Sequence, residues 1–139
     1  MKEPVRIDRL SDQHLRDLTE LFAAAWWAQG RTLDEVCSLF EHDQVFVAYA
    51  DGETDHLIAF ARTITDFTFK AFVLDVIVAE HYRNRGLGSL VMEKLLEHPA
   101  LQKVRCIDLH CLPELIPFYH KHGFEEVPGD IRILRKNVF

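Results

Sequence analysis

Two arginines and two glycines lie close together past the middle of the chain, at Arg83, Arg85, Gly86 and Gly88. They follow an apolar stretch rich in β-branched residues and precede a stretch with apolar residues at helical spacing. At a helix N-terminus the first N–H groups have no intrahelical partner, and the helix dipole adds partial positive charge. Glycine lets an anion approach the backbone closely. The pattern therefore predicts a phosphate-binding loop at the start of a helix.

Two common phosphate-binding loops fit this stretch poorly. A Walker A loop requires Gly-Lys-Ser/Thr, whereas Ser89 directly follows Gly88. A dinucleotide-binding loop fits better, because Asp108 lies 20 residues after Gly88, near the expected position of a ribose-binding acid. However, Val91 replaces the third glycine, and residues 79–85 make the turn after the strand too long. We therefore expect neither type of nucleotide-binding fold.

The remaining pattern, Arg83-x-x-Gly86-x-Gly88, resembles the acetyl-CoA signature of the GNAT superfamily of N-acetyltransferases, Arg/Gln-x-x-Gly-x-Gly/Ala. Two further segments carry the resemblance. One is Asp75-Val76-Ile77-Val78, which precedes the signature at the spacing of the family. The other resembles the family's Phe-Tyr-x-x-x-Gly-Phe segment and reads Phe118-Tyr119-His120-Lys121-His122-Gly123-Phe124. The close resemblance covers about residues 71–126, and the residues before it match only in the order of their elements.

The resemblance implies that acetyl-CoA binds as co-substrate in a gap between two parallel strands. In the family, the pantetheine pairs with the exposed backbone of the first of these strands, which here corresponds to Ile77, Val78 and Ala79. The diphosphate lies over the following loop and the first turn of the helix. The residues implied for that part of the site are Arg83, Asn84, Arg85, Gly86, Leu87, Gly88 and Ser89.

A tyrosine and an aspartate are the residues expected to take part in the transfer itself. Tyr119 matches the tyrosine that family members use as general acid, and a phenol suits this role because its pKa lies above that of a thiol. Asp75 stands in an apolar strand, where a carboxylate is costly unless it is hydrogen-bonded or lines a cavity. It is expected either to accept the proton of the amine or to serve as a structural carboxylate. His110 and Glu114 are weaker alternatives as base.

The acceptor is expected to be a primary amine, first of all a small molecule, with a peptide or protein amine as the second option. Family members usually select the acceptor with their first two helices and the loop before the central strand. Here Trp27, Phe67 and Asp75 are expected to line the acceptor pocket, and Trp26 is expected in the core. With its two tryptophans and Arg31, together with the central stretch, the chain also resembles plant plastid enzymes that acetylate arylalkylamines such as serotonin.

Histidines and cysteines in the last third of the chain do not form a metal-binding pattern. His110, Cys111, His120 and His122 lack the short paired spacings of zinc ligands. Acetyl transfer to an amine also requires no metal. We therefore expect no metal site.

Composition indicates one globular domain spanning residues 1–139. The net charge of −6 argues against a nucleic-acid partner, and no apolar run is long enough to predict a membrane segment. Three cysteines form no disulfide framework, which favours a reducing compartment. The first residues show no signal-peptide pattern, so we expect a cytoplasmic protein without a membrane partner. A homodimer is left open.

The elements that would position these residues form a mixed α/β pattern. We expect helices at 12–27, 33–40, 87–96 and 115–121, and strands at 5–10, 45–50, 57–64, 73–78, 104–109, 124–127 and 131–138. The order β-α-α-β-β-β-α-β-α-β-β matches the GNAT arrangement. A helix joins the strands at 73–78 and 104–109, so these two run parallel, and the resemblance implies that they splay apart. The predicted fold class is therefore α/β, a GNAT-like fold with a mixed sheet.

A second interpretation belongs to a different class of protein. The same signature would suit a catalytically silent acyl-CoA-binding regulatory domain. The intact Tyr119 argues for the enzyme. Thiol release from acetyl-CoA with a panel of amines would distinguish the two.

Overall fold

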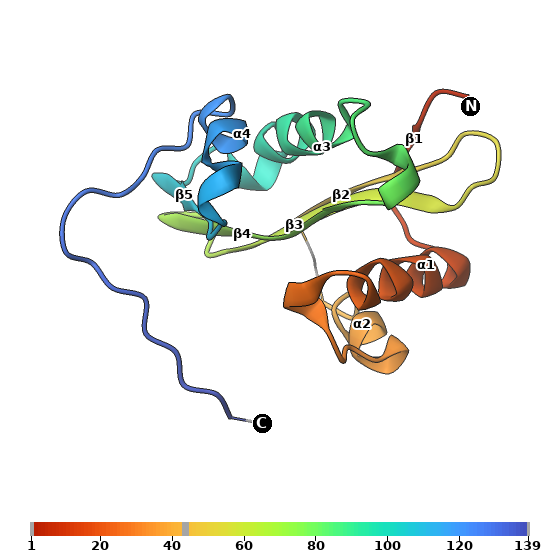
Figure 1. Cartoon of the computed structure of the whole chain (residues 1–139), viewed down its shortest axis with the longest axis horizontal. Coiled ribbons are helices and arrows are strands. Elements are labelled where there is room, and N and C mark those ends of the chain that lie inside the picture. Colours follow the sequence, from red (N-terminus) through yellow and green to blue (C-terminus); the bar gives the residue numbers. More distant parts are fainter. Residues whose placement is uncertain (1, 43–44, 139) are drawn as a thin grey trace.

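The computed structural model describes residues 2–42 and 45–138. Its centre is a sheet whose strands lie in the order β1 (Val5–Ile7), β2 (Val45–Ala50), β3 (Leu57–Thr65), β4 (Lys70–Val78) and β5 (Cys106–Asp108) (Figure 1). Neighbouring strands are antiparallel except β4 and β5, which are parallel. The predicted mixed α/β class and its parallel pair are confirmed, although the pair lies at one edge of the described sheet and not at its centre.

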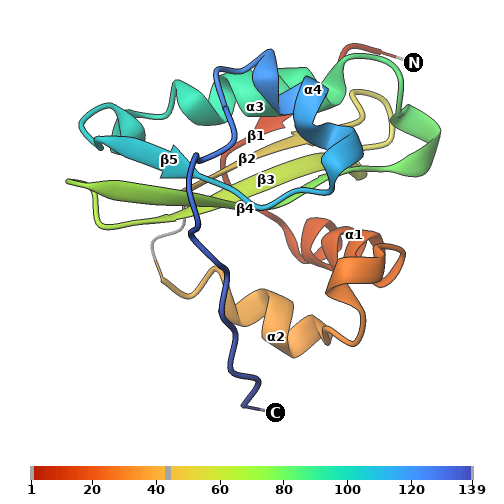
Figure 2. The same cartoon turned by 60° about the vertical axis from the view of Figure 1, so that its left-hand side comes forward.

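Helices cover both faces of the sheet. α1 (Asp12–Ala23) and α2 (Leu33–Ser38) lie on one face, and α3 (Leu87–Leu96) and α4 (Ile116–His120) lie on the other (Figure 2). Each face has its own buried apolar cluster, as expected for three packed layers. No helix within residues 2–42 and 45–138 has the length and apolar character needed to cross a membrane.

The first two helices begin where local signals place them. Ser11 caps α1 and Thr32 caps α2, each in a capping box completed by the third residue of the helix. The end of α1 was predicted less well, because the helix stops at Ala23 and the short 3₁₀ helix η1 (Trp26–Ala28) follows. The helical period does not reach Trp26, which is 69% exposed. The expectation that Trp26 lies in the core is therefore wrong.

β4 contains a β-bulge at Asp75. The register passes from Phe60 opposite Ile77 to Arg62 opposite Leu74, so β4 has one residue more than β3 over this interval. Asp75 has a φ of 55°, a left-handed conformation that few non-glycine residues adopt. One extra residue turns the following side chains to the opposite face of a sheet. Beyond the bulge, Ile77 therefore packs in the cluster beneath α1 and α2.

β4 and β5 separate after a short paired stretch. Their ladder ends at Phe72 opposite Asp108, whereas β4 continues to Val78. In the described chain, no strand lies beside residues 73–78 on that side. The 3₁₀ helix η2 (Glu80–Tyr82) then leads to α3. The predicted splay of the parallel pair is confirmed, and it leaves one edge of β4 unpaired close to the start of α3.

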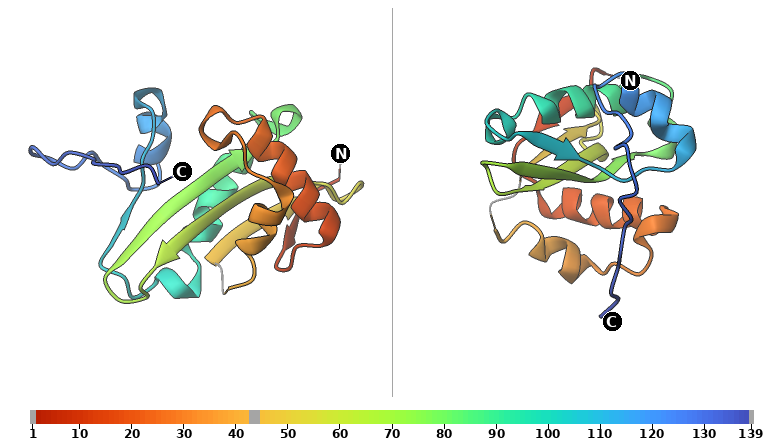
Figure 3. Two further views of the ribbon diagram at one scale, coloured as in Figure 1. Left: turned by 90° about the horizontal axis from the view of Figure 1, so that it is seen from below. Right: turned by 90° about the vertical axis from the view of Figure 1, so that its left-hand side faces the viewer.

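The last two predicted strands, 124–127 and 131–138, are not formed. Beyond the turn at Gly123 the chain runs away from the sheet without regular structure (Figure 3). Nearly all side chains of residues 124–138 are exposed. β5 is also shorter than the predicted 104–109 and offers an edge of only 3 residues. Two strands with so short a partner and no apolar layer beneath them are marginally stable in water. The sequence pattern therefore predicted strands that are not paired with the sheet in the described chain.

Candidate active site

The N-terminus of α3 is open. Gly86 is its N-cap residue and has a φ of 80°, which glycine adopts without strain. No described side chain caps this helix, in contrast to α1 and α2. The first-turn N–H groups of Leu87, Gly88 and Ser89 therefore face away from the helix without a capping partner, and the helix dipole adds to their attraction for an anion. The residues predicted to bind phosphate thus converge on one helix end.

Side chains of the loop before α3 hold it to the neighbouring elements. The Tyr82 hydroxyl donates a hydrogen bond to Asp51 Oδ2 in the β2–β3 turn, at 2.7 Å. Arg83 Nε donates to the carbonyl oxygen of Val78 at 3.1 Å. The guanidinium of Arg85 lies 5.5 Å from the centre of the Tyr82 ring. Arg83 and Arg85 are exposed, so their charges lie at the surface of the loop that Tyr82 fixes.

Gly88 is the point at which α3 approaches α4 and β4. A Cβ at this position would lie 3.4 Å from Phe118 Cζ and 4.0 Å from Val78 Cγ2. A single methyl group here would meet Phe118 at an ordinary contact distance, whereas a larger side chain would collide with it, a constraint that the sequence did not predict. At Gly86, by contrast, a Cβ would have no described atom within 4 Å. The start of α3 is therefore uncovered by described atoms on the side of Gly86.

Tyr119 lies in α4 next to this contact. The residue is 9% exposed, and its ring packs edge-to-face with Phe118 and Phe124, at centroid distances of 5.0 and 6.0 Å. Burial raises the pKa of Tyr119 to about 12, with a smaller contribution from Cys111. No hydrogen bond of the Tyr119 hydroxyl is found within the described residues.

Asp75 is held between two arginines on the face covered by α1 and α2. Arg31 donates to both carboxylate oxygens, at 3.0 and 3.2 Å, and Arg62 Nε donates to Oδ2 at 2.6 Å. The Asp75 side chain is 4% exposed, so the two guanidinium groups compensate a nearly buried charge. Both oxygens already accept hydrogen bonds. Of the two roles expected for Asp75, this geometry favours the structural carboxylate.

Arg31 joins this carboxylate to aromatic residues between α1 and α2. Its guanidinium lies 4.5 Å from the centre of the Phe22 ring and 5.8 Å from that of Trp27. Asp75 and Trp27, both predicted for the acceptor pocket, are thus connected through Arg31. Phe67 lies in the β3–β4 turn, which Figure 3 shows at the far end of β4 from η1. The structure does not bring Phe67 to the other two.

Arg62 is the member of this group that sequence reasoning missed. It is a charged residue in β3, where most neighbours are apolar and buried, just as Asp75 is in β4. Two opposite charges in successive apolar strands were a usable signal. The bulge at Asp75 decides which face the carboxylate takes, and the sequence pattern did not show the bulge.

The histidines and cysteines do not gather. No group of three or more His, Cys, Asp or Glu side chains in the described part of the chain is close enough to hold a metal ion. His110 instead packs edge-to-face against Phe72, with ring centroids 4.7 Å apart.

A family comparison covers the same elements. The family model described as "Acetyltransferase (GNAT) domain" matches residues 41–126, which is more than half of the chain. The matched span includes β4, the loop, α3 and Tyr119. This chain belongs to the GNAT acetyltransferases. The open helix start and the splayed strands of this GNAT chain therefore lie inside the segment that defines its family.

Individual relatives of the GNAT chain extend the match. It is 26% identical over 130 residues to "Uncharacterized N-acetyltransferase ycf52" of Porphyra purpurea, a match that covers 92% of this chain and 74% of that protein. It is 32% identical over 117 residues to "Serotonin N-acetyltransferase 2, chloroplastic" of Oryza sativa subsp. japonica, covering 83% of this chain and 58% of that protein. The chain thus spans only part of the length of each relative.

A solved structure agrees with the fold of this GNAT chain. The crystal structure of "a putative acetyltransferase belonging to the gnat family" from Xanthomonas campestris pv. campestris superimposes with a TM-score of 0.79 at 23% identity, covering 91% of this chain and 87% of that one. At this identity the likeness concerns the fold.

Proposed function

We propose that this chain transfers an acetyl group from acetyl-CoA to the nitrogen of a primary amine. The observation that carries the proposal is the open start of α3 next to the unpaired edge of β4. A long, anionic acyl donor requires both features, because extended chains pair with free strand edges and phosphates bind at helix N-termini. When bound, acetyl-CoA would supply the acetyl group as an activated thioester.

The residues that would hold the donor are those on the two open features. The main chain of Ile77, Val78 and Ala79 would face the pantetheine. The N–H of Ala79 already donates to Ile58 O at 2.8 Å, and its carbonyl oxygen accepts from the N–H of Tyr82 at 2.9 Å, so Ala79 would contribute only the second lone pair of that oxygen. The diphosphate would be held by the loop and the first helical turn, whose members are Arg83, Asn84, Arg85, Gly86, Leu87, Gly88 and Ser89.

Tyr119 would act on the sulfur that leaves when the amine attacks. Its phenol is buried, and the raised pKa of about 12 keeps it protonated across the neutral range. A donor of this kind stabilises the negative charge that develops on sulfur in a partly desolvated site. Tyr119 is therefore proposed as the catalytic proton donor.

Asp75 would act on the acceptor side as a positioning residue. Its ion pairs hold Arg31, and through Arg31 they fix the connection between α1 and α2 against the middle of β4. The amine would attack as the neutral species, which requires no nucleophile from the protein. Release of its proton to water leaves the Asp75 carboxylate ion-paired throughout.

The acceptor is proposed to be a small primary amine with an aromatic group. Trp27 lies beside Arg31, is 39% exposed, and offers an aromatic surface at the acceptor side of the sheet. The relative named as a serotonin N-acetyltransferase supports the same class. Peptide and protein amines form the second class to test.

The test is thiol release from acetyl-CoA with a panel of arylalkylamines, aliphatic amines and peptide amines. Turnover with an amine of the panel supports the enzyme, and Tyr119→Phe serves as the control for non-enzymatic transfer. Binding of CoA without turnover on any amine would favour the silent regulatory domain. Absence of CoA binding would overturn the cofactor site itself.

A further inference from the structure

The turn between β2 and β3 contacts the loop before α3. This turn spans residues 51–56 and lies at the same end of the sheet as residues 80–86 (Figure 1). Asp51, its first residue, is 5% exposed and accepts a hydrogen bond from the Tyr82 hydroxyl on Oδ2, at 2.7 Å. That bond holds the pKa of Asp51 below its ordinary value, so the carboxylate is ionised at neutral pH. Hydrogen bonds to an ionised acceptor are stronger than neutral ones, which makes this contact a firm connection between the turn and the loop.

Asp51 is held in one orientation by its own turn. Its Oδ1 accepts hydrogen bonds from the backbone N–H groups of Glu53 and Thr54, at 2.7 and 3.1 Å. Its own N–H donates to His56 O at 2.8 Å. Because Oδ1 is occupied by the turn, Oδ2 is the oxygen that faces Tyr82. The carboxylate is therefore a fixed acceptor for the Tyr82 hydroxyl.

The turn is also anchored to α1, on the other face of the sheet from α3. The N–H of Leu57 donates to Asp17 Oδ2 at 3.0 Å. Nδ1 of His14 accepts the N–H of Ser11 at 3.1 Å, so in the neutral ring Nε2 carries the proton and donates to Asp55 O at 2.9 Å. His14 and Asp17 are both nearly buried. The turn is therefore fixed from α1 and can support the loop.

The loop has a conformation that depends on such support. The backbone N–H of Tyr82 bonds locally, to Ala79 O at 2.9 Å. Asn84 has a φ of 63°, a left-handed conformation that persists where surrounding contacts hold it. The ring of Tyr82 packs against the apolar cluster beneath α3 and lies 5.5 Å from the guanidinium of Arg85. The hydroxyl of Tyr82 thus fixes the ring on which a predicted diphosphate ligand rests.

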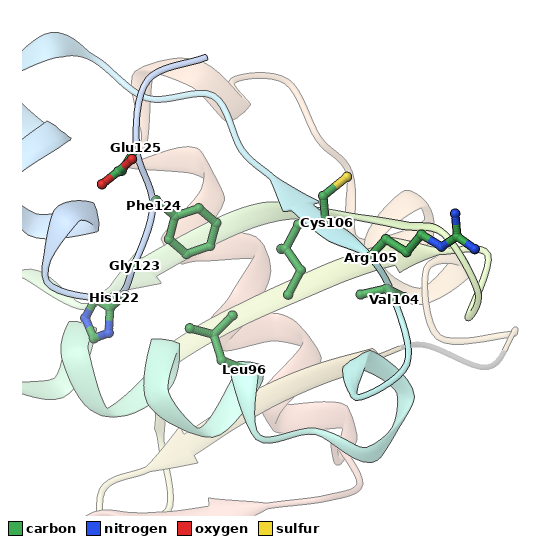
Figure 4. A pocket seen from close by; sticks show the side chains of 9 residues that line it. Leu96, Val104, Arg105, Cys106, His122, Gly123, Phe124 and Glu125 are labelled. Carbon is green, nitrogen blue, oxygen red and sulfur yellow. The ribbon is translucent and has the colours of Figure 1, made fainter. Parts of the chain in front are cut away.

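This contact is separate from a cavity at the other end of α3. The cavity has a volume of about 320 Å³, and Leu96, Val104 and Phe124 are among the residues that line it (Figure 4). Leu96 is the last residue of α3, whereas Tyr82 precedes its first residue, Leu87. The ten residues of the helix place about 15 Å between its ends. The bond between Tyr82 and Asp51 therefore acts on the start of the helix and not on the cavity.

We propose that Asp51 and Tyr82 are positioning residues for the acyl donor: the fixed carboxylate holds the phenol, and the phenol holds the loop and Arg85 where the diphosphate of acetyl-CoA binds. This inference rests on the proposed use of acetyl-CoA by the chain. A site whose loop must first be ordered binds its ligand more weakly than a preorganised one. Loss of the bond should therefore weaken binding of the diphosphate part of the donor and leave binding of the pantetheine arm unchanged.

The first test uses Tyr82→Phe, which removes the hydroxyl and keeps the ring. Calorimetry on the full chain should show CoA binding weakened about 3- to 10-fold, the net worth of one hydrogen bond. Binding of pantetheine, which lacks the diphosphate and the nucleotide, should change by less than ~2-fold, whereas a general structural defect would weaken both ligands. Tyr49→Phe is the matched control, because Tyr49 belongs to the same apolar cluster and its variant should keep the parental affinity for CoA.

The second test changes the acceptor of the bond. Asp51→Asn keeps an oxygen for the N–H groups of the turn and replaces Oδ2, which accepts the phenol proton, by an amide group. This variant should also weaken CoA binding, and Asp51→Asn/Tyr82→Phe should bind CoA no more weakly than Tyr82→Phe alone, since both changes break one bond. Thermal unfolding shows that each variant is folded before its affinity is compared.

Three outcomes would overturn the inference while leaving the proposed function in place. They are parental CoA affinity in Tyr82→Phe, equal losses for CoA and pantetheine, and additive losses in Asp51→Asn/Tyr82→Phe. A parent chain that does not bind CoA would instead overturn the proposed function, and the inference with it.

Discussion

Arg62 Nε donates a hydrogen bond to Asp75 Oδ2 at 2.6 Å, across the bulged part of the ladder between β3 and β4. Arg31 binds the same carboxylate from the connection between α1 and α2. A nearly buried carboxylate thus joins two strands and the acceptor-side helices in one charged cluster. Removing the carboxylate would leave two guanidinium groups without their counter-charge, so a substitution at Asp75 tests the cluster.

Asp75→Asn should lower the free energy of unfolding by roughly 3 kcal/mol, because two guanidinium groups lose their counter-charge in a largely buried setting. Urea unfolding measures this, and Asp130→Asn, on an exposed residue, is the control. If Asp75 were the base, the variant would keep its stability and lose about 10²–10⁴-fold in kcat. That outcome would identify Asp75 as the general base.

Tyr119→Phe should reduce kcat by at least ~10²-fold while changing the affinity for acetyl-CoA by less than ~3-fold, the pattern of a group that acts in the transition state. The substitution keeps the ring packed between Phe118 and Phe124 and deletes only the proton. Steady-state kinetics and calorimetric CoA binding separate the two quantities. An unchanged kcat, under conditions where chemistry limits the rate, would leave Tyr119 as a packing residue.

Stability at alkaline pH should also depend on Tyr119. Burial raises its pKa from 10.0 to about 12, so the folded state holds the phenol proton more tightly than the unfolded state. The resulting stability is fully present below pH 10 and is lost as the pH rises toward 12. Urea unfolding across this window should show a decline that is shallower in Tyr119→Phe. Equal slopes for the two proteins would contradict the buried, high-pKa phenol.

The start of α3 offers a graded test of cofactor binding. Gly88→Val should weaken CoA binding by more than ~10-fold, about 1.4 kcal/mol. It should also destabilise the fold, because the branched side chain meets Phe118, whereas the single methyl group of Gly88→Ala is tolerated at 3.4 Å. Calorimetry on the folded fraction separates affinity from stability. Normal folding and parental CoA affinity in Gly88→Val would show that the diphosphate binds elsewhere.

Arg83→Ala should weaken CoA binding less than Gly88→Val, with a loss that shrinks as salt is added, because the charge is exposed. The titration is run at low and high salt. Arg16→Ala, on an exposed arginine of α1 at the other face of the sheet, provides the control. A salt-independent loss would indicate that Arg83 acts through its hydrogen bond to Val78 O instead of through its charge.

Several features followed from the sequence alone because their causes are local. Ser11 and Thr32 cap helices through side chains within the same turn, and the apolar run from Val45 to Ala50 indicated a strand. Gly86 and Gly88 predicted a phosphate-binding loop at the start of the helix that follows the strand at residues 73–78, and in the structure that helix start has no side-chain cap. Local chemistry thus determined the order of elements up to α4, the parallel pair and the position of the candidate cofactor site.

Other features depended on contacts between distant segments. The bulge that directs Asp75 to Arg62 and Arg31 arises from the pairing of β3 with β4, and strand register is not encoded within either strand. Gly88 faces Phe118 only because α4 returns beside α3. Residues 131–138 have the pattern of a strand, but a strand requires a partner edge, and the tertiary structure places that edge out of their reach. Sequence therefore determined which elements this protein can form, and the tertiary structure decided which of them meet, because pairing energy is gained only between segments that the fold brings together.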